Sequence, residues 1–239
     1  LYILVVLLQD HGVFRAGQWG QKTIIHEGLY HGTQIPFIKT ALQSGGGVIV
    51  LNPNDNLIDL KVEEEWLNFA LKEETHSAPQ SPWLIPKRCS SSPEEHTVYN
   101  VAFVAHGYGG LVFINLLMQR KWEVMKKVYA VALIDSTHHT MHQTRGDLQV
   151  QEWIWQHCRE WVTNSRPLDR PTGSLVKMDC PTVSAGTENY SLAPSSSLQA
   201  IFKYFRSALK AKTTVVLPPR SPILTRSVAT KKGINKRSA

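Results

Sequence analysis

The segment Val101–Gly110 (VAFVAHGYGG) joins an apolar run, a turn of small residues and the beginning of an amphipathic helix. This is the pattern of a nucleophile elbow, a strand-to-helix turn that presents a serine to the substrate while the next backbone N–H helps to bind the oxyanion. Here the central position, between His106 and Tyr108, is Gly107. Glycine has no side chain to attack a carbonyl, but it adopts the strained torsions of such a turn easily. The pattern therefore predicts an elbow without its nucleophile.

The segment Gln9–Gly12 (QDHG) ends the first apolar run of the chain. α/β-Hydrolases often build the other half of the oxyanion hole at this place, so His11 and Gly12 are candidates for an oxyanion loop. For both turns an ordinary alternative stays open. Glycines are frequent at strand-to-helix turns of parallel sheets, including those that bind phosphate.

A polar cluster follows the apolar run 128–134, with Asp135, Ser136, His138, His139 and His142. An acid at the end of a strand suits the residue that orients a catalytic histidine, so Asp135 and His138 are candidates for remnants of a triad. Ser136 is either a substitute nucleophile or a helix cap. Because the histidines lack a recognised ligand spacing such as HExxH, we predict no metal and no other cofactor.

These residues need a framework, and the hydrophobic pattern predicts an α/β fold. Continuous apolar runs are typical of strands buried on both faces, and they occur at 1–8, 48–51, 101–105 and 128–134, with a weaker one at 182–185. Helical patterns lie between them, at 33–44, 59–74, 110–121, 148–163 and 197–210. This alternation predicts a mostly parallel sheet with helices on both faces. We expect one domain at 1–209, interrupted by a Pro/Ser-rich loop at 75–97, and a basic disordered tail at 210–239.

The net charge of +7 lies in the tail. From Asn189 onward the chain has ten basic residues and no acidic one, whereas residues 1–188 contain 16 basic and 19 acidic residues. The predicted fold is thus slightly acidic and gives no support for a nucleic-acid-binding surface on the domain itself. Nuclear localisation and RNA contact are the functions predicted for the tail's basic pairs, with a solvated, functionless tail as the alternative. These pairs are Lys231, Lys232, Lys236 and Arg237.

The beginning of the chain and its cysteines bear on where the protein is located in the cell. The longest apolar run at the start has eight residues, whereas a membrane helix needs roughly 20, so no membrane association is predicted. The chain begins at Leu1 within an expected strand, which suggests an upstream segment. The three cysteines, Cys89, Cys158 and Cys180, are odd in number and form no CxxC pair. They favour reduced thiols over a disulfide framework or a zinc site.

Several blocks of the sequence resemble, in order, the family of Argonaute-binding cotranscriptional regulators. The family's shared unit is the Arb2 domain, which also occurs in fungal histone deacetylases. The blocks are Arg15–Trp19, Gly32–Ile38, Gly47–Asn54, Ser92–His96, the AH-YGG elbow, Val131–Ser136 and Val183–Thr187, within about residues 1–210. The resemblance implies an α/β-hydrolase-like fold, a location in the nucleus with the cytoplasm as a further site, and Argonaute, small RNA, chromatin and splicing factors as partners.

Three departures from the family's pattern bear on activity and folding. The family has serine where this chain has Gly107, and histidine where it has Tyr190. The family also has a longer segment between the Ser92–His96 block and the elbow strand, where only residues 97–100 remain here. The short segment predicts an incompletely covered elbow strand. Together the departures are typical of a divergent or pseudogene-derived vertebrate paralogue.

Four hypotheses follow. The first is a non-catalytic nuclear module, a pseudoenzyme that has kept the fold. The second is a residual serine-type hydrolase that uses Ser136 with His138 or His106. The third is a chain that associates with nucleic acid through its tail, and the fourth is a genetic relic whose product is not stable.

Overall fold

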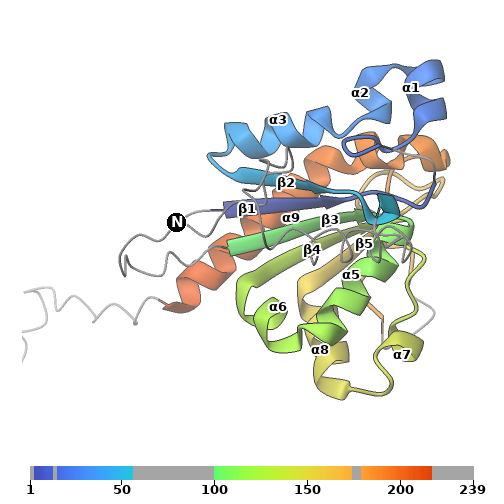
Figure 1. Cartoon of the computed structure of the whole chain (residues 1–239). Helices are drawn as coiled ribbons and strands as arrows, with labels where there is room; N and C mark the ends of the chain where they lie inside the picture. Colours follow the sequence, from blue (N-terminus) through green and yellow to red (C-terminus); the bar gives the residue numbers. More distant parts are fainter. Residues whose placement is uncertain (1–2, 13–14, 56–99, 174–178, 217–239) are drawn as a thin grey trace, which may run out of the picture.

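The computed structural model describes residues 3–12, 15–55, 100–173 and 179–216. Its centre is a six-stranded sheet with the order β2-β1-β3-β4-β5-β6, in which all neighbouring strands are parallel (Figure 1). The predicted α/β fold with a parallel sheet is confirmed. The strands are β1 (Ile3–Leu8), β2 (Gly47–Leu51), β3 (Asn100–His106), β4 (Val128–Ile134), β5 (Cys158–Val162) and β6 (Thr182–Ser184).

Helices cover both faces of the sheet, as the sequence predicts (Figure 1). One face carries α1 (Gln21–Glu27), α2 (Leu29–Gly32), α3 (Ile35–Gln43) and the long α9 (Ala193–Val216). The other carries α5 (Tyr108–Gln119), α6 (Lys121–Lys127), α7 (Thr140–Gln143) and α8 (Leu148–His157). Two short 3-10 turns, η1 (Pro53–Asp55) and η2 (Tyr190–Leu192), complete the described elements.

Two hydrophobic cores hold these layers together, one on each face of the sheet. Phe37 of α3 and Phe202 of α9 belong to the first core, and Phe113 of α5 and Ile154 of α8 to the second. All seven residues of the central strand β4 are buried, which explains its continuous apolar sequence. Strand β2 lies at the edge of the order, and exposed residues alternate along it with half-buried ones.

One predicted element is wrong. The helix expected at 148–163 ends at His157, and residues 158–162 form strand β5 instead. Trp161 is paired with Ile134 of β4 and is fully buried in the sheet. Cys158 and Trp161 are three residues apart and both buried, so they imitate a helical face although they lie on a strand.

The predicted beginning of the tail is also wrong, because α9 continues beyond Lys210 to Val216. The helix expected at 59–74, the loop at 75–97, and Lys231, Lys232, Lys236 and Arg237 lie outside the described residues. Within the described helices, no segment is both long and apolar enough to cross a membrane.

The elbow strand β3 is not left open to water. Ala102, Val104 and Ala105 are fully buried, and Phe103 is only 7% exposed. A groove of about 340 Å³ nonetheless lies beside Phe103, between α5 and the carboxyl ends of β1 and β2. The sequence predicts an incompletely covered elbow strand, whereas the structure shows a buried strand with a groove beside it.

Candidate functional site

The elbow lies between β3 and α5, at the carboxyl edge of the sheet. Gly107 has φ 53° and ψ −117°, in the region with positive φ that residues with a side chain rarely adopt. Its N–H donates to the carbonyl of Ile134 at 2.9 Å, which fixes the turn against β4. The backbone thus has the strained strand-to-helix turn predicted from the sequence, with glycine at the position of the nucleophile.

A carboxylate of the chain itself occupies the place where an oxyanion would bind. Asp10 Oδ1 accepts hydrogen bonds from the backbone N–H groups of Tyr108 and His11, each at 2.7 Å. Tyr108 follows the nucleophile position, so its N–H is the donor that a working elbow aims at the oxyanion. The second oxygen of Asp10, Oδ2, accepts from the hydroxyl of Tyr190 at 2.6 Å. Three donors therefore converge on one side chain.

The same two side chains fill the space of the missing nucleophile. A Cβ atom added at Gly107 would collide with the Asp10 carboxylate and with the Tyr190 hydroxyl. Burial, and then the hydrogen bond and negative charge of Asp10, raise the pKa of Tyr190, so this phenol stays protonated and donates. Tyr190 thus holds the Asp10 carboxylate in place.

His106 is buried within the same site but has no polar role that the structure describes. Its side chain packs against the rings of Tyr190 and Trp19, with centroids 4.7 and 5.9 Å away. Neither ring nitrogen has a hydrogen-bond partner among the described residues. Burial lowers the pKa of His106 to about 4, against the opposing charge of Asp10, so the ring is neutral at pH 7. It lacks the contacts of a general base.

The two residues of the predicted oxyanion loop have different roles. The backbone N–H of His11 belongs to the donor set, and its ring packs edge-on against Tyr108 with centroids 5.4 Å apart. The N–H of Gly12 turns away to the side-chain oxygen of Asn54 at 3.1 Å. Asp10 lies in the same sequence segment, but its role was missed because acidic residues are not expected in an oxyanion hole.

The predicted pair of Asp135 and His138 is not formed. Asp135 Oδ1 accepts from the backbone N–H and the hydroxyl of Thr163, at 2.7 and 3.1 Å. Burial, more than these hydrogen bonds, determines its pKa, which is raised. Asp135 therefore joins the ends of β4 and β5, and none of the histidines that the structure describes is hydrogen-bonded to it.

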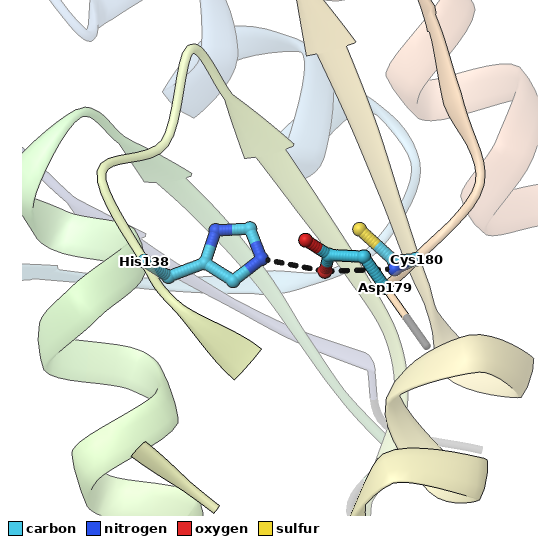
Figure 2. Close-up of side chains that lie close together, drawn as sticks. All are labelled: His138, Asp179 and Cys180. Atoms are coloured by element: carbon cyan, nitrogen blue, oxygen red, sulfur yellow. Dashed lines mark hydrogen bonds and ion pairs between the residues drawn. The ribbon is translucent and has the colours of Figure 1, made fainter. Parts of the chain in front are cut away.

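His138 instead contacts a residue that the sequence reasoning missed, Asp179. Its Nε2 lies 3.1 Å from Asp179 Oδ1, and its Nδ1 lies 2.7 Å from Ser136 Oγ. Burial lowers the pKa of His138, but the Asp179 hydrogen bond and the charge of Glu160 outweigh it and raise the pKa overall. The side chain of Cys180 lies beside the Asp179 carboxylate (Figure 2). His138 and Asp179 are 41 residues apart, which no sequence pattern bridges.

The chain of Ser136, His138 and Asp179 has the residue types of a hydrolase triad, but its serine is poorly placed for attack. Ser136 Oγ packs so tightly against α5 that a Cβ at Gly110 would collide with it. It also accepts the backbone N–H of His138 at 3.3 Å, which is a local turn interaction. The cluster is better suited to holding a positive charge or a metal ion than to nucleophilic attack.

Comparisons with known proteins agree with the resemblance in the sequence. A model of the Arb2 domain family matches residues 2–168. The human protein ARB2BP is 55% identical over 253 residues, covering 96% of this chain and 70% of ARB2BP. The cotranscriptional regulators ARB2A of Homo sapiens and Mus musculus are each 40% identical, covering 90% and 93% of this chain.

The chain spans only 61% and 62% of the length of these two ARB2A proteins. Among solved structures, the histone deacetylase Clr3 matches with a TM-score of 0.46 and 14% identity, over 87% of this chain and 32% of Clr3. The family match and the identities to ARB2BP and ARB2A lead to one conclusion: the chain is a member of the Arb2 domain family.

Proposed function

We propose that this chain is a non-catalytic module that acts by binding, and that its elbow is a remnant of a hydrolase site. The observation that carries the proposal is the occupation of the site by Asp10 and Tyr190. A nucleophile needs both a reactive side chain and an open oxyanion hole. At Gly107 the first is missing, and the second is filled by a carboxylate whose negative charge opposes the binding of another anion.

Family membership supports a role in the nucleus. The ARB2A relatives are named cotranscriptional regulators, and this chain shares 40% identity with the human protein. From the resemblance of the sequence to Argonaute-binding cotranscriptional regulators, we infer that the module works with Argonaute and small RNA in chromatin silencing and in cotranscriptional splicing regulation. The basic residues from Asn189 onward are compatible with nuclear entry or RNA contact, while the slightly acidic remainder points to a protein partner for the domain.

A specific distance favours a second candidate function, the residual hydrolase. Ser136 Oγ lies 2.7 Å from His138 Nδ1, which is within reach for proton transfer. The chain should be treated with a fluorophosphonate probe and assayed with generic esters, beside a Ser136→Ala variant and an active serine hydrolase. We expect no labelled serine and no turnover. Turnover that is lost in the Ser136→Ala variant would establish the second function and refute the first.

The binding role is tested by precipitation of the tagged full chain from nuclear extract, with and without RNase. We expect Argonaute to be recovered and the recovery to fall after RNase treatment. The recovery of Argonaute by a Gly107→Ala variant, in which the new side chain strains the elbow, is compared with that of the wild-type chain. A difference between the two would show that the elbow contributes to binding. Recovery of no Argonaute under either condition would contradict the proposed partner.

The contribution of the tail is measured separately with a short single-stranded RNA at several salt concentrations. We compare the full chain with a variant in which Lys231, Lys232, Lys236 and Arg237 are alanine. Each phosphate contact that is lost reduces the slope of log affinity against log salt by about 0.7 for single strands. Equal slopes for the two proteins would exclude these four residues from RNA contact.

A further inference from the structure

A group of three potential metal ligands lies on the α5 and α8 face of the sheet, away from Asp10 and Tyr190. His138 comes from the loop after β4, and Asp179 and Cys180 come from the segment just before β6. The imidazole nitrogen, a carboxylate oxygen and the thiol sulfur all lie within 4.8 Å of one another. Figure 2 shows the imidazole of His138 directed at the Asp179 carboxylate, with the sulfur of Cys180 beside it.

We propose that His138, Asp179 and Cys180 form a Zn²⁺ site. A mixture of nitrogen, oxygen and sulfur ligands suits zinc, which is a borderline-soft ion without a strong geometric preference. The thiolate and the carboxylate carry two negative charges, which balance the charge of the ion. Three protein ligands leave a fourth tetrahedral position for water or a small ligand.

The distances agree with such a site. In a tetrahedral zinc site with bonds of about 2.0–2.2 Å, two ligand atoms lie about 3.3–3.6 Å apart. The His138 Nε2 to Asp179 Oδ1 distance is 3.1 Å, so a small outward shift of these two groups is enough to admit the ion. His138 and Cys180 are buried, whereas the Asp179 side chain is 27% exposed and gives the ion a way in from solvent.

Neighbouring groups hold the ligands as they do in known zinc sites. His138 Nδ1 pairs with Ser136 Oγ at 2.7 Å, which leaves Nε2 to face the ion. Asp179 Oδ1 accepts from the hydroxyl of Thr140 at 2.8 Å and from the backbone N–H of Cys180 at 2.9 Å. These contacts fix the ring and the carboxylate before the ion arrives.

Binding is a displacement of protons with no change of oxidation state. The Cys180 S–H bond breaks, its proton goes to solvent, and a Zn–S bond forms. Zinc needs an unprotonated Nε2, so any proton on Nε2 goes to solvent as the Zn–N bond forms. The neutral ring keeps its one proton on Nδ1, which donates to Ser136 Oγ. A bond between zinc and the carboxylate of Asp179 completes the three protein ligands.

The test uses the purified full chain, its zinc content by mass spectrometry, and its absorption after replacement of zinc by Co²⁺. We expect about one zinc per chain and a cobalt spectrum with a thiolate charge-transfer band. The His138→Ala and Cys180→Ser variants should lose both. Two matched controls should keep both: His139→Ala, which removes the exposed neighbouring histidine, and Cys158→Ser, which removes the other buried thiol described in this core.

The unmodified chain keeps the proposal falsifiable even where a variant fails to fold. Absence of the thiolate band in the cobalt-loaded wild-type chain, or zinc content unchanged in Cys180→Ser, overturns the proposal. If the band is lost in Cys158→Ser but kept in Cys180→Ser, the thiolate ligand is Cys158 and the assignment of Cys180 as a ligand is wrong. A lower Tm of the wild-type chain after chelation, restored by Zn²⁺ alone, supports a site that also stabilises the fold.

Discussion

The occupied elbow makes a quantitative prediction about Gly107→Ser, the substitution that places a serine at the nucleophile position of the turn. The new Cβ needs the space of the Asp10 carboxylate and the Tyr190 hydroxyl, so Asp10 must leave its place. A side chain at φ 53° costs about 1–2 kcal/mol of strain. Loss of the three hydrogen bonds of Asp10, at about 1 kcal/mol each for a half-exposed group, adds about 3 kcal/mol.

The free energy of unfolding should therefore fall by about 4–5 kcal/mol, a large part of the roughly 5–15 kcal/mol of a typical domain. In an Asp10→Ala background those hydrogen bonds are already lost, and the Tyr190 hydroxyl is no longer held by Asp10 and can turn aside, so Gly107→Ser should cost only about 1–2 kcal/mol. The two substitutions are thus coupled by about 3 kcal/mol.

The assay is a double-mutant cycle measured by urea denaturation with tryptophan fluorescence. Four proteins are needed: the wild type, the two single variants and the double variant. A third substitution, Thr40→Ser, changes a side chain whose hydroxyl donates to the carbonyl of Pro36 on its own helix, α3, and it should add independently of both. An equal cost of Gly107→Ser with and without Asp10 would refute the reasoning, because it would mean that Asp10 does not fill the nucleophile's place.

Two further predictions concern buried rings. His106 has its pKa lowered to about 4, below the ordinary 6.5, so stability should be full above pH 6.5 and fall by roughly 3 kcal/mol as the pH drops toward 4. Urea denaturation at pH 7 and at pH 5 should show about 2 kcal/mol of this loss. A His106→Phe variant with the same pH dependence as the wild type would contradict the prediction. Trp161→Ala should cost about 3–5 kcal/mol, because the ring is fully buried and donates to Asp169 at 2.9 Å. Trp155→Ala is the matched control, because Trp155 is 49% exposed and its loss should cost less than about 1 kcal/mol. Equal melting temperatures for the two variants would contradict the placement of Trp161 on a buried strand, β5.

The parts of the fold that could be predicted are those whose pattern is local. β1, β3 and β4 are continuous apolar runs, and their burial in the structure explains why. β5 was missed because it follows α8 directly, with no turn residue between His157 and Cys158 to mark the boundary. Periodicity alone does not separate a short buried strand from the last turn of a helix.

The candidate site follows the same division. The turn at Gly107 is encoded by neighbouring residues and was predicted. The side chains that fill it could not be predicted, because Asp10 contacts Tyr108 and Tyr190 across 98 and 180 residues of sequence. Likewise, no ligand spacing joins His138 to Asp179 and Cys180, so a cluster that the fold assembles left no signal in the sequence.

Helix α9 has a consequence for how many partners the molecule can hold at once. It begins next to Tyr190 at the elbow, and Phe205 of its second half contacts Tyr129 near the beginning of β4, with ring centroids 6.2 Å apart. The 24 residues of the helix span about 36 Å and end near the amino ends of the strands (Figure 1). Helix α9 therefore ends at the edge opposite Gly107. A macromolecule attached there leaves the elbow edge free, so the two edges can be occupied simultaneously without competing for space.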